Sequence, residues 1–158
     1  MNAKTIQLTI NGEARSVDVG AGESLLHLLR RIGFTGVKNG CDEGACGACT
    51  VILNGRTVNA CLTFAFQAAG GRVETIEFLG NFENPHPLQK ALADEGAVQC
   101  GYCIPGMILS AKALLDRKAA PTDEEWSLHL DGNLCRCTGY EKIQSALRKL
   151  VAAQGGDQ

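Results

Sequence analysis

Eight cysteines stand in this chain of 158 residues, and their spacing divides them into two groups of four. The first group has the form C-x4-C-x2-C with a later fourth member: Cys41, Cys46, Cys49 and Cys61. The second group is a C-x2-C followed much later by a C-x-C: Cys100, Cys103, Cys135 and Cys137. Groups of four thiolates bind iron–sulfur clusters or structural zinc. The spacing therefore predicts two metal centres that use every cysteine.

The first group lies in a glycine-rich loop that contains Gly40, Gly44 and Gly47. Its opening is the plant-type spacing for a 2Fe–2S cluster. Glycine lets such a loop turn sharply and direct backbone N–H groups at sulfur. A zinc site more often uses two short paired hooks of cysteines. The spacing favours a 2Fe–2S cluster over zinc at this site.

The second group is less specific. A C-x2-C motif occurs in redox thiols, zinc hooks and haem attachment sites, but no histidine follows Cys103 as haem attachment requires. The surroundings have a helical pattern rather than the βαβ context of a thioredoxin-like motif. Its spacing fits either a 2Fe–2S cluster or structural zinc. We expect Tyr102 and Tyr140, which flank this group, to pack in the helix core rather than to shield the site.

Composition narrows the class of protein. The formal net charge of −2 and an aromatic content of 5% do not favour a nucleic-acid partner. No apolar run approaches the roughly 20 residues that cross a bilayer, so we expect no direct membrane insertion. The first residues show no signal peptide, which makes the cytoplasm the expected location. Clustered cysteines in a reducing compartment more often bind metal than form disulfides.

The first half has the pattern of a small α+β unit. Alternating apolar residues on both sides of Asn11-Gly12 and of Asn54-Gly55 predict two hairpins, because both positions of such a turn need positive φ. Ser24 can cap a leucine-rich helix that ends at Gly33. A last strand is predicted over 73–79. These elements predict a first domain over 1–79.

The second half has a helical pattern after a proline-containing linker over 80–87. Helices are predicted over 88–95 and 107–117. The pair Thr122 and Glu125 predicts a capping box for a third helix, and Thr138 with Glu141 predicts one for the fourth. These elements predict a helical domain over 88–153 and a frayed tail over 154–158.

The motifs together resemble the iron–sulfur subunit of the molybdenum hydroxylase (xanthine oxidase) family. The resemblance covers nearly the whole chain. Its segments are GCDEGACGACTV over 40–51, Cys61, VQCGYCIPGM over 98–107 and GNLCRCTGY over 132–140. Every cysteine agrees with the family's pattern in order and spacing.

The resemblance implies an N-terminal plant-ferredoxin-like β-grasp domain and a C-terminal four-helix bundle, each with one 2Fe–2S cluster. It implies a large subunit with molybdenum and a molybdopterin (dinucleotide), and a medium subunit with FAD, in a heterotrimer or a dimer of heterotrimers. Electrons would pass from molybdenum through the helical-domain cluster and the ferredoxin-like cluster to FAD or an external acceptor. Gln99 and Cys137 correspond to residues that contact the pterin.

The chain carries none of the sequence motifs of a substrate site, such as GxGxxG after a strand, a P-loop, GxSxG or HExxH. We therefore expect an electron-transfer subunit whose substrate is bound elsewhere. Purines, N-heteroaromatics, aldehydes, carbon monoxide and aroyl-CoA thioesters are all candidate substrates. Two alternatives are a free-standing ferredoxin-type carrier and a non-redox adaptor with zinc at the second site.

Overall fold

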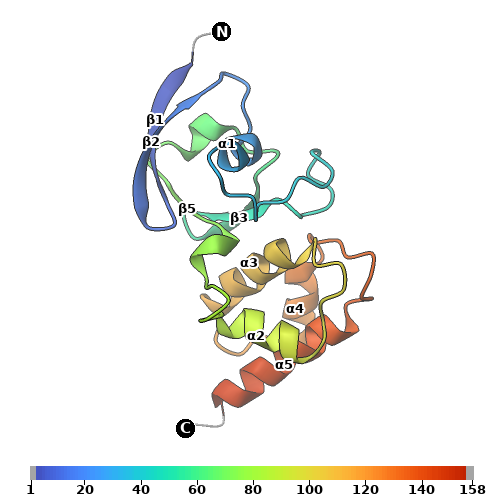
Figure 1. Ribbon diagram of the computed structural model, residues 1–158. Helices are drawn as coiled ribbons and strands as arrows, with labels where there is room; N and C mark the ends of the chain where they lie inside the picture. The colour runs from blue at the N-terminus through green and yellow to red at the C-terminus, as the bar shows by residue number, and fades with distance from the viewer. Residues whose placement is uncertain (1–2, 156–158) are drawn as a thin grey trace.

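The structure is a computed structural model that describes residues 3–155. It consists of one mixed sheet with the strand order β2-β1-β5-β3-β4, followed along the chain by a group of four helices. Figure 1 shows the blue N-terminal strands at one end of the molecule and the red C-terminal helix at the other. The sheet and the helices form two layers that meet in the middle.

Two antiparallel hairpins make up most of the sheet. The first joins β1 (Lys4–Ile10) to β2 (Glu13–Val19), and the second joins β3 (Thr50–Leu53) to β4 (Arg56–Asn59). Both turns are Asn-Gly pairs with positive φ, at 52° and 85° in the first turn and at 51° and 79° in the second. The two predicted hairpins are confirmed.

The last predicted strand is much shorter than expected. Strand β5 covers only Arg72–Glu74, between β1, with which it is parallel, and β3, with which it is antiparallel. The chain then enters a short 3-10 helix, η2 (Ile76–Phe78). The prediction fails because the side chain of Asn11 accepts a hydrogen bond from the Thr75 amide and donates one to its hydroxyl. The residues after Thr75 then pack against the helical core.

Helix α1 (Leu25–Arg31) closes one face of the sheet, as predicted. The Ser24 hydroxyl caps it by accepting a hydrogen bond from the His27 amide, and Gly33 follows with a φ of 104°. All four leucines of α1 are fully buried. A second 3-10 helix, η1 (Ala65–Ala68), was not predicted. It packs beside α1, and its two alanines join the same core.

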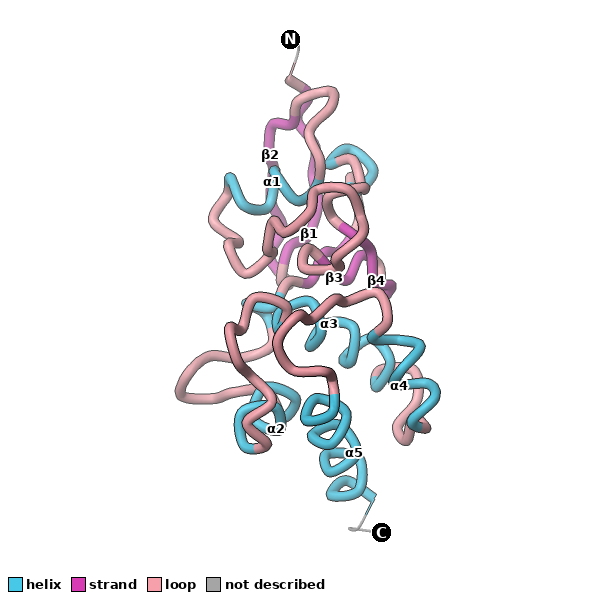
Figure 2. The backbone as a smooth tube through the Cα atoms, turned by 90° about the vertical axis from the view of Figure 1, so that its right-hand side faces the viewer, coloured by secondary structure: helices cyan, strands magenta, loops and turns pink. Residues whose placement is uncertain are grey.

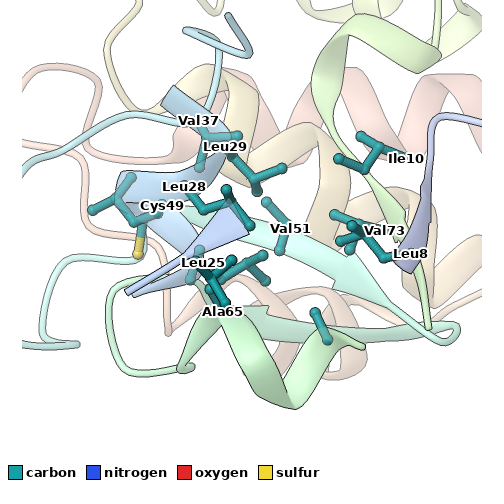
Figure 3. Close-up of a cluster of buried hydrophobic side chains, with 14 of the residues drawn as sticks. Leu8, Ile10, Leu25, Leu28, Leu29, Val37, Cys49, Val51, Ala65 and Val73 are labelled. Atoms are coloured by element: carbon teal, nitrogen blue, oxygen red, sulfur yellow. The ribbon is translucent and has the colours of Figure 1, made fainter. Parts of the chain in front are cut away.

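Figure 3 shows this core. Leu25 and Leu29 of α1 approach Val51 and Val73 of the sheet, and Cys49 lies at the edge of the cluster. Burial of these apolar side chains supplies most of the free energy that holds α1 on the sheet. A cysteine of the first group is thereby anchored in the folded core.

The helical layer contains α2 (Pro87–Asp94), α3 (Ile104–Leu115), α4 (Asp123–Leu130) and α5 (Glu141–Gly155). Helix α3 begins three residues earlier than predicted, with proline in its first turn, where the missing N–H costs nothing. The predicted capping box of α4 is present with both of its hydrogen bonds. Trp126 on this helix is buried in the core, as are Ile143 and Leu147 of α5.

The predicted capping box of α5 is wrong. This helix begins at Glu141, so Thr138 is too early in the chain to cap it. The Thr138 hydroxyl instead donates to the Cys135 sulfur and accepts from the Tyr140 amide. Tyr140 has a φ of +65°, which turns the chain into the helix. Residues 154 and 155 of the predicted tail are helical, and 156–158 lie outside the described residues.

The two layers share a buried contact. Helix α3 lies against β3, as the side view in Figure 2 shows. Ile52 of the sheet and Leu109 and Ala113 of α3 are almost completely buried in one cluster. None of the described helices is long and apolar enough to cross a membrane.

Candidate iron–sulfur centres

The first group of cysteines is carried by the loop that joins α1 to β3 and by the segment after β4. Cys49 immediately precedes β3, and Cys61 follows β4, so the hairpin brings them together. Their sulfur atoms lie 3.4 Å apart. Cys41 and Cys46 form the other pair, with the Cys46 amide directed at the Cys41 sulfur over 3.4 Å. We name this group the first quartet.

The second group is held by the ends of helices. Cys103 lies at the N-terminal end of α3, and Cys100 is in the turn before it. Cys135 and Cys137 lie in the loop between α4 and α5. The sulfur atoms of Cys100 and Cys137 are 3.6 Å apart, and both residues are exposed. We name this group the second quartet.

Both quartets are arranged as pairs. Cys41 interacts with Cys46, Cys49 with Cys61, Cys103 with Cys135, and Cys100 with Cys137. Within residues 3–155, no three histidine, cysteine or acidic side chains converge as the ligands of one ion would. A tetrahedral zinc ion draws four ligands around one point, whereas a 2Fe–2S cluster takes two ligands at each iron. All eight thiols are free, so the donor set fits two such clusters.

The protonation of the thiols follows their surroundings. Backbone N–H groups, first that of Glu43, lower the pKa of Cys41 to about 7. Burial raises the pKa of Cys49 and that of Cys103 to about 12. Burial also raises the pKa of Cys46, and the hydrogen bond with Cys100 raises that of Cys137, so each quartet has at least two thiols that stay protonated in the metal-free chain at neutral pH. Because metal ligands must be deprotonated, cluster binding would displace those protons.

A cavity of about 250 Å³ lies between the quartets. Six of the eight cysteines line it: Cys41 and Cys46 of the first quartet, and Cys100, Cys103, Cys135 and Cys137 of the second. The remaining lining residues are Gly40, Ala48, Tyr102, Leu134 and Arg136. The two predicted metal centres are therefore neighbours across the boundary between the sheet layer and the helices.

Three hydrogen bonds join the two ligand loops directly. The Leu134 amide donates to the Cys46 carbonyl over 2.9 Å. The Asn133 amide side chain donates to the Gly47 carbonyl, also over 2.9 Å. The Tyr102 hydroxyl donates to the Asn39 carbonyl over 2.6 Å. These bonds fix the position of one quartet relative to the other.

Asn133 is the most buried of the three residues that donate these hydrogen bonds. Its side chain is 2% exposed, accepts from the Ser110 hydroxyl and also donates to the Thr50 hydroxyl. Buried amides of this kind are costly to leave unpaired, which explains why every polar atom of the side chain is used. No local sequence signal identifies Asn133, because Gly47 lies 86 residues away in the chain.

The two tyrosines behave differently from each other. Tyr140 packs against the helical core, as predicted, and its hydroxyl accepts from the Cys135 amide and donates to the Asn133 carbonyl. Tyr102 is 47% exposed and lies on the wall of the cavity, so the prediction of core packing is wrong for it. Its hydroxyl finds a partner in the other layer, which draws the ring out of the helical core.

Gln99 lies in the turn before Cys100 and is exposed. Among the described residues, no protein group makes a hydrogen bond to its side-chain amide. The adjacent Cys100 forms an exposed pair with Cys137. The two residues with a predicted pterin contact therefore belong to one exposed edge of the second quartet.

Comparison with known proteins agrees with this architecture. A family model described as a 2Fe-2S iron-sulfur cluster binding domain matches residues 8–72, and one described as a 2Fe-2S binding domain matches residues 75–148. The chain is 53% identical to the nicotinate dehydrogenase small FeS subunit of Eubacterium barkeri, over 96% of this chain and 97% of that one.

The chain is also similar to one solved structure and to part of a longer protein. The quinoline 2-oxidoreductase structure from Pseudomonas putida 86 has a chain that matches with a TM-score of 0.91 at 40% identity, over 99% of both chains. The aldehyde oxidoreductase of Megalodesulfovibrio gigas is 46% identical over 94% of this chain, which spans 17% of that protein. The same unit thus occurs both within a larger chain and on its own as a separate subunit.

The fold and the paired thiols define a two-centre iron–sulfur protein with a ferredoxin-like domain and a helical domain. The chain belongs to the family of small iron–sulfur subunits of the molybdenum hydroxylases. Its role is electron transfer within an oxidoreductase. The relationship to subunits of nearly the same length does not favour the free-standing carrier.

Proposed function

We propose that the first and second quartets are the ligands of two 2Fe–2S clusters. A 2Fe–2S cluster, when bound, takes up and releases one electron at a time. The observation that carries this proposal is the shared cavity, which six cysteines from both quartets line. Two one-electron centres whose ligands share the lining of one small cavity would form a continuous route through the chain.

The chain's own residues then have three tasks. Buried Cys49 and Cys103 anchor one side of each site in the protein core, where solvent is excluded. Backbone N–H groups directed at sulfur, such as that of Cys46 toward Cys41, stabilise negative charge on the centre. The hydrogen bonds between the loops hold the spacing of the two sites.

We assign the exposed edge of the second quartet to a large molybdenum-binding partner. Gln99 and Cys137 would contact its molybdopterin there, since both are exposed and the Gln99 amide has donors and an acceptor to offer. The first quartet would serve a medium FAD-binding partner. A heterotrimer, or a dimer of heterotrimers, is the assembly that this division of tasks requires. We place the assembly in the cytoplasm, a reducing compartment in which clustered cysteines more often bind metal than form disulfides.

Low-temperature EPR with spin counting on the dithionite-reduced chain tests the ligand assignment. Two distinguishable S = 1/2 signals with about two spins per chain are expected. Cys49→Ser should remove or alter the first-quartet signal alone, and Cys103→Ser the other alone. A single signal in the unaltered chain, with zinc found at the second quartet, would contradict the proposal and favour the adaptor.

The purified complex gives a second test. Cys137→Ser should stall reduction of the flavin by substrate at the molybdenum side, and Cys49→Ser should stall delivery to the flavin. Flavin reduction at the unaltered rate in both variants would contradict the wiring.

The substrate that we propose for the partner is an N-heteroaromatic ring of the pyridine type, as distinct from a purine. The support is the 53% identity to a nicotinate dehydrogenase small FeS subunit that matches over almost its full length. A second nicotinate dehydrogenase subunit, from Pseudomonas putida, is 45% identical, and the nicotine 6-hydroxylase small subunit of Paenarthrobacter nicotinovorans is 44% identical. Assay of the complex with nicotinate, hypoxanthine and an aromatic aldehyde tests this choice, and faster turnover of either of the last two would contradict it.

A further inference from the structure

Tyr102 occupies an unusual position. It lies in the chain between Cys100 and Cys103 of the second quartet, but its hydroxyl bonds across the boundary to the Asn39 carbonyl over 2.6 Å. Asn39 is two residues before Cys41 of the first quartet. The ring is half-exposed and lines the cavity between the quartets. One side chain therefore touches the surroundings of both sites.

Within the described residues, few backbone hydrogen bonds hold the segment that Tyr102 contacts. Asn39 and Gly40 are exposed, and the nearest backbone tie before them is a 3.3 Å bond from the Lys38 amide to the Ala48 carbonyl. The tyrosine ring also lies near Gly40, because a Cβ at that glycine would lie 3.8 Å from the ring's Cε1 atom, although it would lie closer to the Cys46 sulfur, at 2.8 Å. Ring and hydroxyl thus act on the same short segment next to Cys41.

We propose that Tyr102, although it belongs to the loop of the second quartet, is a positioning residue for the first cluster. Its hydroxyl fixes the backbone at Asn39, and that backbone sets the direction from which Cys41 and the neighbouring N–H groups approach the sulfur ligands of the first site. Hydrogen bonding around the ligands is one of the factors that set the properties of an iron–sulfur centre. This inference rests on the proposed function of the first quartet.

The proposal predicts that a substitution in the loop of the second quartet alters the cluster of the first quartet. Tyr102→Phe removes one hydroxyl and keeps the ring, and the ties through Leu134 and Asn133 remain, so the fold is retained. The change should alter the EPR signal of the first cluster and leave that of the second as it is. A residue that only packed in its own loop would affect the second signal.

Tyr140→Phe is the matched control. Its hydroxyl bonds to the Cys135 amide and the Asn133 carbonyl, both on the helical side. This variant should alter the second signal and leave the first unchanged. The cysteine-to-serine variants described above assign each signal to its quartet.

The experiment combines EPR of the reduced, fully loaded complex with hydrogen exchange of the peptide that covers 38–46. The lost bond restrains the segment through the Asn39 carbonyl, so its loss should make local opening more frequent and speed amide exchange in that peptide by about tenfold in Tyr102→Phe and not in Tyr140→Phe. An unchanged first signal together with unchanged exchange would overturn the inference, and so would an effect on the second signal alone. If the unaltered complex shows fewer than two signals, the proposed function fails instead, and the exchange result still judges the hydrogen bond.

Discussion

Gly47 shows how closely the two halves approach at the level of single atoms. It lies between Cys46 and Cys49, has a φ of +67° and is buried. A Cβ at this position would lie 2.0 Å from the Gly132 carbonyl oxygen and 2.8 Å from the Asn133 side-chain nitrogen. Its own carbonyl accepts the hydrogen bond from Asn133. A side chain here would push the first ligand loop away from the helical domain.

The substitution Gly47→Ala should therefore destabilise the protein more than a positive φ alone explains. Gly55→Ala is the control, because Gly55 has a φ of +79° and a Cβ there would meet no described atom within 4 Å beyond its chain neighbours. We expect a loss of about 1–2 kcal/mol for the control from backbone strain. Gly47→Ala should cost about 1–3 kcal/mol more from overpacking. Denaturant unfolding measures both, and equal losses would refute the close contact.

Some of the functional residues could be predicted from the sequence, and others could not. The cysteines are recognisable because the spacing of each motif is local in the chain. Asn133 and Tyr102 are not, because their partners lie 86 and 63 residues away and only the folded chain brings them together. Residues that act through contacts across the domain boundary cannot be recognised from a local sequence motif.

At the level of helices, strands and turns, local sequence motifs predicted the structure correctly where no other residue competed for the same hydrogen-bonding groups. The Asn-Gly turns and the caps at Ser24 and Thr122 formed as predicted. The strand beyond Glu74 did not form, since the Asn11 side chain, 64 residues away, binds the Thr75 backbone. The predicted cap at Thr138 did not form because its hydroxyl binds the Cys135 sulfur and the Tyr140 amide instead.

The capping box of α4 should make a measurable contribution to the free energy of unfolding. Thr122→Ala removes the oxygen that accepts from the Glu125 amide and should lower the free energy of unfolding by about 1 kcal/mol. Thr122→Ser keeps that oxygen and should remain within a few tenths of the unaltered protein. Thermal or denaturant unfolding compares the two variants. Equal stability of Thr122→Ala and Thr122→Ser would show that the cap contributes nothing.

The same helix should respond to acid. The Lys118 ammonium, followed by the Thr122 amide, lowers the pKa of Glu125 from 4.5 to about 2. The lower pKa in the folded state means that the ionised carboxylate stabilises α4 above pH 4.5, and that this contribution is lost as the pH falls toward 2. Hydrogen exchange of α4, corrected for intrinsic rates, should show protection falling across this range. In Glu125→Gln that part of the pH dependence should be absent.

At the scale of the whole molecule, the two domains share a core as well as a set of hydrogen bonds. Ile52, Leu109 and Ala113 are each no more than 2% exposed, and they lie between the sheet and α3. Domains joined in this way lose part of their own core if they separate. We expect the two halves to unfold together in one transition.

Leu109→Ala tests this coupling. The deletion leaves a cavity at the boundary and should cost about 2–5 kcal/mol, with both iron–sulfur signals lost at the same lowered temperature. Leu128→Ala on α4 is the control, because Leu128 is 67% exposed and a surface change of this kind usually stays within about 0.5 kcal/mol. Visible circular dichroism during heating follows both centres. Loss of the two signals at clearly separate temperatures would contradict a shared unfolding transition.

The separation of 86 positions between Gly47 and Asn133 also sets a delay between the synthesis of these two residues on the ribosome. At elongation rates of about 5–20 residues per second, the first ligand loop is made roughly 4–17 s before the side chain that holds it. During that interval its thiols are present but the loop lacks its partner in the other domain. The first site therefore reaches its final shape only after Asn133 has been made and has left the ribosome, which places its maturation well after the synthesis of its own cysteines.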